Sequence, residues 1–132
     1  LREQTKRRLM NEILFLLTLL MFKHTVVDFY IQRSFMFADK HIYGGKGGLT
    51  HAGMHGIGTA IVLFSFFSPA AVLLVACLDS IVHYHVDYAK SKIQLAKNYT
   101  INDTKYWILF GTDQFLHFVT YIVILVMLYD AA

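Results

Sequence analysis

The chain alternates long apolar runs with short polar breaks. The runs approach or exceed the about 20 residues that a membrane-spanning helix needs. The breaks are the Gly-rich "ADKHIYGGKGG", the proline-containing "FFSPAA" and the amphiphilic "KSKIQLAKNYTINDTK". This pattern predicts an all-α polytopic membrane protein, in which residues 1–132 form a single domain. We expect an antiparallel four-helix transmembrane bundle with helices at about residues 9–35, 49–67, 70–88 and 105–129.

Composition supports a membrane protein over a soluble one. The 132 residues are 56% hydrophobic and only 16% charged, and the mean hydropathy is +0.48. The formal net charge is +3, but the basic residues lie at the ends of apolar runs rather than as a stripe on a polar face. We therefore expect the lipid bilayer as partner and no nucleic acid, while a homo-oligomer stays open.

Each predicted helix carries a polar pair at a spacing of four residues, in "HTVVD", "HAGMH", "HYHVD" and "DQFLH". Residues four apart lie on one helix face, so each pair presents two side chains to one neighbour. A single such pair is usually a hydrogen bond between helices. Four pairs in consecutive helices favour shared coordination, because each ionisable group within hydrocarbon needs a partner, a water-filled cavity or a metal. The candidate metal ligands are His24, Asp28, His51, His55, His83, Asp87, Asp113 and His117.

The antiparallel order also predicts where these pairs meet. The first and third helices end on the side where the second and fourth begin, so all four pairs lie toward one membrane face. Ordered by depth, a deeper layer holds four histidines and a shallower layer holds mostly carboxylates. The deeper layer is His24, His55, His83 and His117, and the shallower one is Asp28, His51, Asp87 and Asp113.

Imidazoles and carboxylates without a set of thiolates favour zinc, with iron or manganese as alternatives. Eight candidates exceed the four ligands of one zinc ion. Either two metals are bound, or one metal is held by a subset while the remaining aspartates hydrogen-bond the histidines. A haem between histidine pairs is a third option, but it explains none of the acids.

The motifs "HTVVDFYIQ", "LTHAGMH", "HYHVDYAK" and "DQFLH" resemble, in order and approximate spacing, the four signatures of an uncharacterised family. It comprises small bacterial and phage membrane proteins and is known as domain of unknown function 3307. The resemblance implies an integral protein of the bacterial inner membrane, encoded by a bacterium or a phage, and implies no particular activity. It adds Gln32, Lys90 and Gln114 to the site, which we interpret as substrate contacts.

Two classes of function stay open from the sequence. The first is a metal-dependent hydrolase or transferase that acts on a lipid-linked or small phosphorylated substrate, with Asp87 or Asp113 as the base. The second is a non-enzymatic membrane protein, either a metal or proton carrier or a structural subunit whose polar cluster only holds helices together. The apolar runs "LLTLL" and "VILVML" in the far half of the bundle predict no through-path and modestly favour the enzyme.

Other residues receive weaker predictions. Lys23 is expected to point away from the site, because neighbours on a helix diverge by about 100°. Asp79, one turn from His83, is expected either to support the site or to contact another helix. Cys77, the only cysteine, is expected to be a small packing residue.

Overall fold

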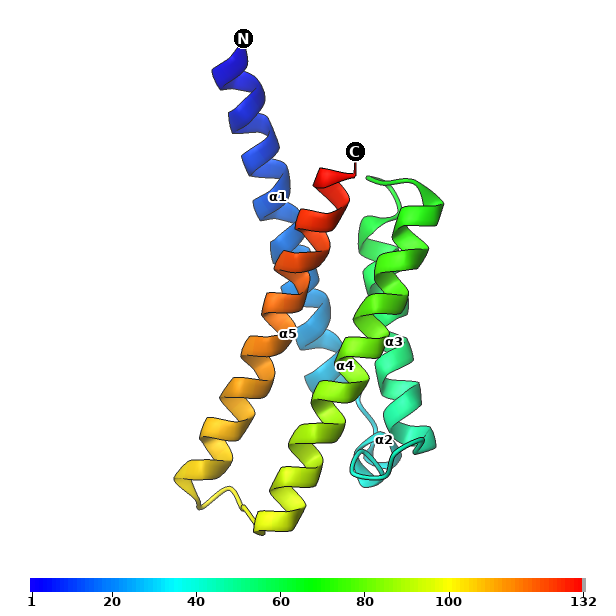
Figure 1. The fold of residues 1–132 in the computed structure, drawn as a ribbon, viewed down its shortest axis with the longest axis vertical. Coiled ribbons are helices and arrows are strands. Elements are labelled where there is room, and N and C mark those ends of the chain that lie inside the picture. The colour runs from blue at the N-terminus through cyan, green and yellow to red at the C-terminus, as the bar shows by residue number, and fades with distance from the viewer. Residues whose placement is uncertain (132) are drawn as a thin grey trace.

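The computed structural model describes residues 1–131, and in that part of the chain every regular element is helical. Helices α1, α3, α4 and α5 pack side by side, with both termini at one end and α2 and the α4–α5 connection at the other (Figure 1). The all-α prediction is confirmed. The elements are α1 (Arg2–Thr25), the π-helix η1 (Val26–Ile31), α2 (Ser34–Ala38), α3 (Lys46–Leu63), α4 (Pro69–Lys97) and α5 (Thr104–Asp130).

Three helical segments are long and apolar enough to cross a membrane: Arg2–Ile31, which joins α1 and η1, then α4 and α5. Helix α3 is not among them. It has only 18 residues, and glycines and two histidines interrupt its apolar positions. The large hydrophobic side chains exposed along the helices are consistent with contact with lipid.

Two helices are longer than predicted. Helix α1 begins at Arg2 and α4 continues to Lys97, because the polar sequences there are rich in strong helix formers and hold no Gly or Pro. Asn98 follows the last residue of α4 and caps the helix, and its φ of 53° lies in the left-handed region typical of a helix C-terminus. Much of the predicted third connector is therefore helical.

The first connector is also more ordered than its glycines indicate. The chain leaves the helical conformation at Gln32, earlier than predicted, and forms the short α2. Asp39 then accepts hydrogen bonds from the backbone N–H groups of Gly47 and Gly48, each at 2.9 Å. A carboxylate at this position satisfies otherwise free N–H groups and stabilises the start of α3.

The half of the bundle nearest the termini is filled by apolar side chains from all four long helices. Leu16, Leu20, Leu63 and Ile124 have no exposed surface at all. This core matches the apolar half expected from the sequence and closes the bundle on that side. Its buried members are Leu16, Leu20, Leu63, Val72, Val75, Tyr121, Ile124, Leu125 and Leu128.

Candidate metal centre

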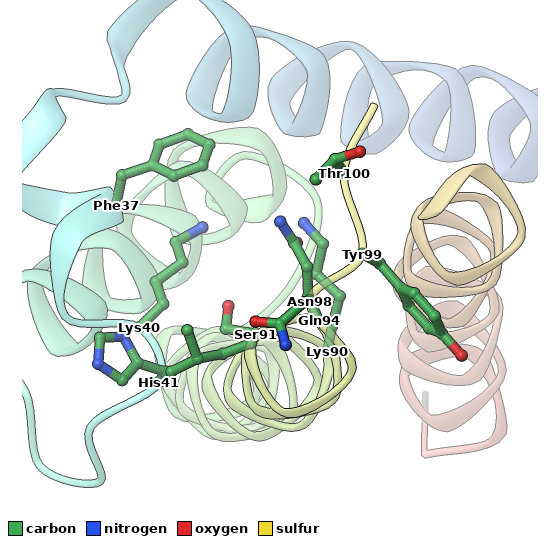
Figure 2. Close-up of a pocket in the computed structure, with 10 residues that line it drawn as sticks. Phe37, Lys40, His41, Lys90, Ser91, Gln94, Asn98, Tyr99 and Thr100 are labelled. Atoms are coloured by element: carbon green, nitrogen blue, oxygen red, sulfur yellow. The ribbon is translucent and has the colours of Figure 1, made fainter. Parts of the chain in front are cut away.

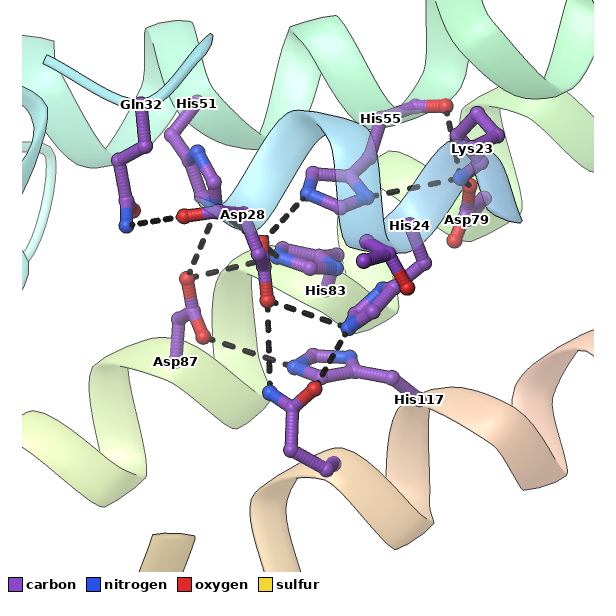
Figure 3. Close-up of polar contacts among 12 residues, drawn as sticks. Lys23, His24, Asp28, Gln32, His51, His55, Asp79, His83, Asp87 and His117 are labelled. Atoms are coloured by element: carbon purple, nitrogen blue, oxygen red, sulfur yellow. Dashed lines mark hydrogen bonds and ion pairs between the residues drawn. The ribbon is translucent and has the colours of Figure 1, made fainter. Parts of the chain in front are cut away.

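The four polar pairs meet in the other half of the bundle, where α1 passes into η1, α3 begins, α4 approaches its end and α5 begins. Figure 3 shows the first three pairs together with His117 of the fourth. All eight predicted ligands belong to one connected network of nitrogen and oxygen contacts. The four predicted deep histidines lie against one another. The ring centroid of His24 is 5.1 Å from that of His55, 5.5 Å from that of His83 and 5.0 Å from that of His117.

Asp28 lies at the middle of this network. Its Oδ1 atom is 2.9 Å from His55 Nε2 and 3.1 Å from His51 Nε2, while its Oδ2 atom is 3.1 Å from His24 Nε2. Asp28 belongs to the π-helical turn η1, and single π-helical turns are frequent at functional sites. The sequence showed the spacing of His24 and Asp28 but gave no signal for the π turn.

One ligand atom from each of Asp28, His51, His55 and His83 forms a group in which all four atoms lie within 4.8 Å of one another. A tetrahedral zinc site with bonds of about 2.0–2.1 Å has ligand atoms about 3.3 Å apart. The separations here are comparable. Asp28 Oδ1 is 2.9, 3.1 and 3.9 Å from the Nε2 atoms of His55, His51 and His83, and the last two nitrogens are 3.2 Å apart. This group could therefore hold a metal ion.

A second group consists of His83, Asp87 and His117, again within 4.8 Å. Asp87 Oδ2 lies 3.4 Å from His83 Nε2, and Asp87 Oδ1 lies 3.5 Å from His117 Nε2. His83 is common to both groups, and its ring is stacked between His55, at 3.5 Å, and His117, at 3.9 Å. The two candidate sites therefore adjoin at His83.

His24 lies outside both groups. Lys23 Nζ donates to the Tyr121 hydroxyl at 3.0 Å, and this hydroxyl lies 2.9 Å from His24 Nδ1. We infer from these partners that the hydrogen of neutral His24 is on Nε2, where it points to Asp28. In this arrangement His24 orients the carboxylate of Asp28 rather than offering a ligand atom.

Asp113 also lies outside both groups. Its Oδ1 atom is 3.4 Å from His117 Nε2, and its Oδ2 atom accepts a hydrogen bond from Gln114 Nε2 at 3.1 Å. Lys90 Nζ is 4.0 Å from the same Oδ2 atom. Asp113 therefore lies at the border of the cluster, beside the second group.

The two glutamines named by the resemblance both contact Asp28. Gln114 Nε2 lies 3.3 Å from Asp28 Oδ2, and Gln114 Oε1 lies 3.1 Å from His24 Nε2. Gln32 donates to the main-chain oxygen of Asp28 at 3.1 Å, which closes the last turn of η1. Their contacts hold Asp28 in place.

The prediction that Lys23 points away from the site is wrong. Its side chain is buried, and Nζ lies 2.9 Å from Asp79 Oδ2 and 3.2 Å from the main-chain oxygen of His55. The long stem bends across Gly58, where a Cβ atom would lie 2.7 Å from Lys23 Cγ, so the missing side chain makes the room. A lysine and an aspartate isolated in two apolar helices were the signal for this pair.

Asp79 and Lys40 are both members of buried ion pairs. Asp79 accepts a hydrogen bond from the Thr59 hydroxyl at 2.5 Å in addition to the ion pair with Lys23. Lys40, from the turn after α2, places Nζ 2.6 Å from Asp87 Oδ2. Nothing in the sequence pattern indicates the Lys40 contact, because it depends on how the α2 segment folds back onto α4.

The charges of this half of the bundle are unevenly matched. Asp79 pairs with Lys23 and Asp87 pairs with Lys40, whereas Asp28 has no Lys or Arg within 4.0 Å among the described residues. The carboxylate of Asp28 contacts imidazoles and the amide of Gln114. A carboxylate in a low-dielectric interior needs a compensating charge. A divalent cation between Asp28 and the three histidines would supply that charge.

These observations define a class of protein: a helical bundle with apolar helices and a buried cluster of histidines and aspartates. Residues 16–132 match the family described as Protein of unknown function (DUF3307), and because the match covers most of the chain, the chain belongs to this family. The resemblance seen in the motifs is thereby confirmed. No curated protein and no solved structure gives a significant match.

Proposed function

We propose that this protein is an integral membrane metalloprotein that binds a divalent cation near one membrane face. The observation that carries the proposal is the convergence of Asp28 Oδ1 and three imidazole groups at spacings that suit a tetrahedral ion. The donor set favours zinc, with iron or manganese as alternatives. His83, Asp87 and His117 would form an alternative position for the ion, because the same His83 Nε2 atom faces both groups and can bind only one ion at a time.

The proposal includes four membrane helices. Helix α3 packs along α4 through most of its length, and its outward positions Leu49, Ile57, Ile61 and Phe64 are apolar and more than half exposed. Such a face suits lipid better than water. We therefore propose an antiparallel four-helix transmembrane bundle in a bacterial inner membrane, encoded by a bacterium or a phage.

We propose hydrolysis or group transfer as the reaction. A divalent cation in such a site lowers the pKa of a coordinated water. Asp113 would accept the proton of that water, because Asp113 lies beside the second ligand group without belonging to it. Asp87 then serves as a ligand rather than as the base. The apolar core beyond Lys23 and Asp79 supports a site open to one side only, which disfavours a carrier.

The alternative is a structural cluster without metal. It is favoured by the dense direct contacts, in which His24 finds protein partners for both ring nitrogens. Elemental analysis separates the two. Protein purified through a tag without histidines should contain about one equivalent of zinc, iron or manganese per chain. Protein that holds none of these, and takes up none after incubation with each metal followed by desalting, would contradict the proposal.

A further inference from the structure

A cavity of about 360 Å³ opens beside the candidate metal centre. It lies between the turn after α2, the last turns of α4 and the α4–α5 connection. Figure 2 shows Lys40 and Lys90 reaching toward this opening from two different segments. The volume is within the range of small-molecule sites, which is about 300–1,000 Å³.

The cavity lining is basic. It includes Lys40, Lys90 and His41, and it contains no Asp or Glu. Both lysines are largely buried, with side-chain exposures of 8% for Lys40 and 15% for Lys90. Lysines at a membrane surface usually extend to head groups or water. These two instead hold their ammonium groups at the cavity.

The same two lysines link the cavity to the metal centre. Lys40 Nζ lies 2.6 Å from Asp87 Oδ2, and Lys90 Nζ lies 4.0 Å from Asp113 Oδ2. Asp87 belongs to the second ligand group, and Asp113 is the proposed base. An anion held by Lys40 and Lys90 would therefore lie next to the groups that perform the reaction.

The neutral lining residues are mostly hydrogen-bonding ones. Gln94 and Asn98 follow Lys90 at intervals of four residues, and Ser91 adds a hydroxyl from the same helix (Figure 2). A phosphate group has the charge and the several acceptor oxygens that two ammonium groups, amides and a hydroxyl satisfy together. A single carboxylate would leave much of this donor set unused.

We propose that this cavity binds the phosphate group of the substrate, either a soluble phosphate monoester or a phosphorylated lipid head group. Its role as a substrate site rests on the proposed metal function, but phosphate binding itself does not. Lys90 is the main anchor, and Lys40 adds a second positive charge. Lys92 offers a matched control, because it is exposed, lies on the same helix, contacts the Tyr88 ring and does not line the cavity.

The test uses the full chain in phosphatidylcholine nanodiscs, after chelator treatment so that phosphate cannot bind through a metal. Inorganic phosphate is titrated against chloride at constant ionic strength, and binding is followed by broadening of the ³¹P resonance. Lys90→Gln should weaken binding about tenfold or more, as expected for loss of one charged hydrogen bond. Lys92→Gln should bind as the unchanged protein does. Equal binding by Lys90→Gln and the unchanged protein would overturn the proposal.

Metal uptake is measured on separate portions of the same preparations that are not treated with chelator, so the two proposals fail separately. Lys90→Gln should retain metal uptake and the thermal unfolding midpoint, which shows that it folds. Metal uptake without phosphate binding would overturn the phosphate site alone, whereas Lys90-dependent phosphate binding without metal uptake would support it and overturn the metal function.

Two further arms identify the source of the phosphate. Nanodiscs that contain phosphatidic acid should suppress inorganic phosphate binding if a lipid head group occupies the cavity. Competition by glycerol 3-phosphate in phosphatidylcholine discs, without an effect of phosphatidic acid, would assign a soluble ester. Either result supports a phosphate site. Failure of both competitors would overturn the proposal that a phosphate monoester or a phosphorylated lipid head group occupies the cavity.

Discussion

The Nε2 atoms of His51 and His83 face each other at 3.2 Å, although the residues lie on different helices and both are buried. This distance is close to the edge of a tetrahedron around a zinc ion. His83 also belongs to both ligand groups. We therefore expect His83 to contribute more to metal binding than the other histidines do.

Replacement of His83 should therefore remove more metal than replacement of any other histidine. We expect His83→Ala to lose nearly all bound metal, because both groups lose a ligand. His51→Ala should still bind an ion at the second group, and His117→Ala should still bind one at the first, because each of these variants removes a ligand from one group only. Elemental analysis of the purified variants measures this order.

A control for these variants is His85→Ala, on the same helix as His83. His85 is exposed, and its Nδ1 lies 2.7 Å from the main-chain oxygen of Ile81, away from the cluster. Its metal content should equal that of the unchanged protein. If His83→Ala also kept its full metal content, neither ligand group would hold the metal.

His24→Ala should weaken metal binding without abolishing it. His24 hydrogen-bonds Asp28 and belongs to neither ligand group, and loss of such a supporting contact typically costs about 10 to 100-fold in metal affinity. Competition with a chromophoric chelator gives the affinity of each variant. Complete loss of metal, with the helical circular dichroism intact, would instead make His24 a direct ligand, as the sequence predicts.

The buried pair of Lys23 and Asp79 should show strong coupling. Lys23→Met leaves Asp79 buried with Thr59 as its remaining hydrogen-bond donor, and loss of one partner of a buried ion pair typically costs about 3–5 kcal/mol. Lys23→Met combined with Asp79→Asn should be more stable than the sum of the single changes implies. Unfolding midpoints in detergent test this cycle. Strictly additive effects would show that the pair contributes nothing as a pair.

The site-bearing side of the bundle should face the cytoplasm. Positively charged residues favour that side of a membrane. The site-bearing end carries Arg33, Lys40, Lys46, Lys90, Lys92, Lys97 and Lys105, whereas the end with the termini carries Arg2, Lys6, Arg7 and Arg8.

Cysteine labelling in intact cells tests this orientation, in a Cys77→Ala background because Cys77 is exposed. A thiol introduced at Asn102, which is exposed in the α4–α5 connection, should resist an impermeant reagent, and one at the exposed Gln4 should react. The reverse pattern would put the metal centre on the outer face.

The sequence by itself determined the helical class, the four polar motifs and the end of the bundle at which they meet. Hydropathy and helical spacing are local properties, so a run of apolar residues or a pair such as His24 and Asp28 can be recognised without its neighbours. Helix direction follows from short connections. These features sufficed to bring the eight candidate residues to one place.

Only the tertiary structure decided which atoms converge. The rotation of each helix against its neighbours places His83 between two ligand groups and leaves His24 and Asp113 outside them. Long side chains add reach that spacing does not reveal: Lys23 crosses Gly58 to Asp79, and Lys40 reaches Asp87 from a turn. Contacts between distant segments depend on how the helices pack and on differences of a few ångströms in side-chain position. Neither can be predicted from the residue pattern within one helix.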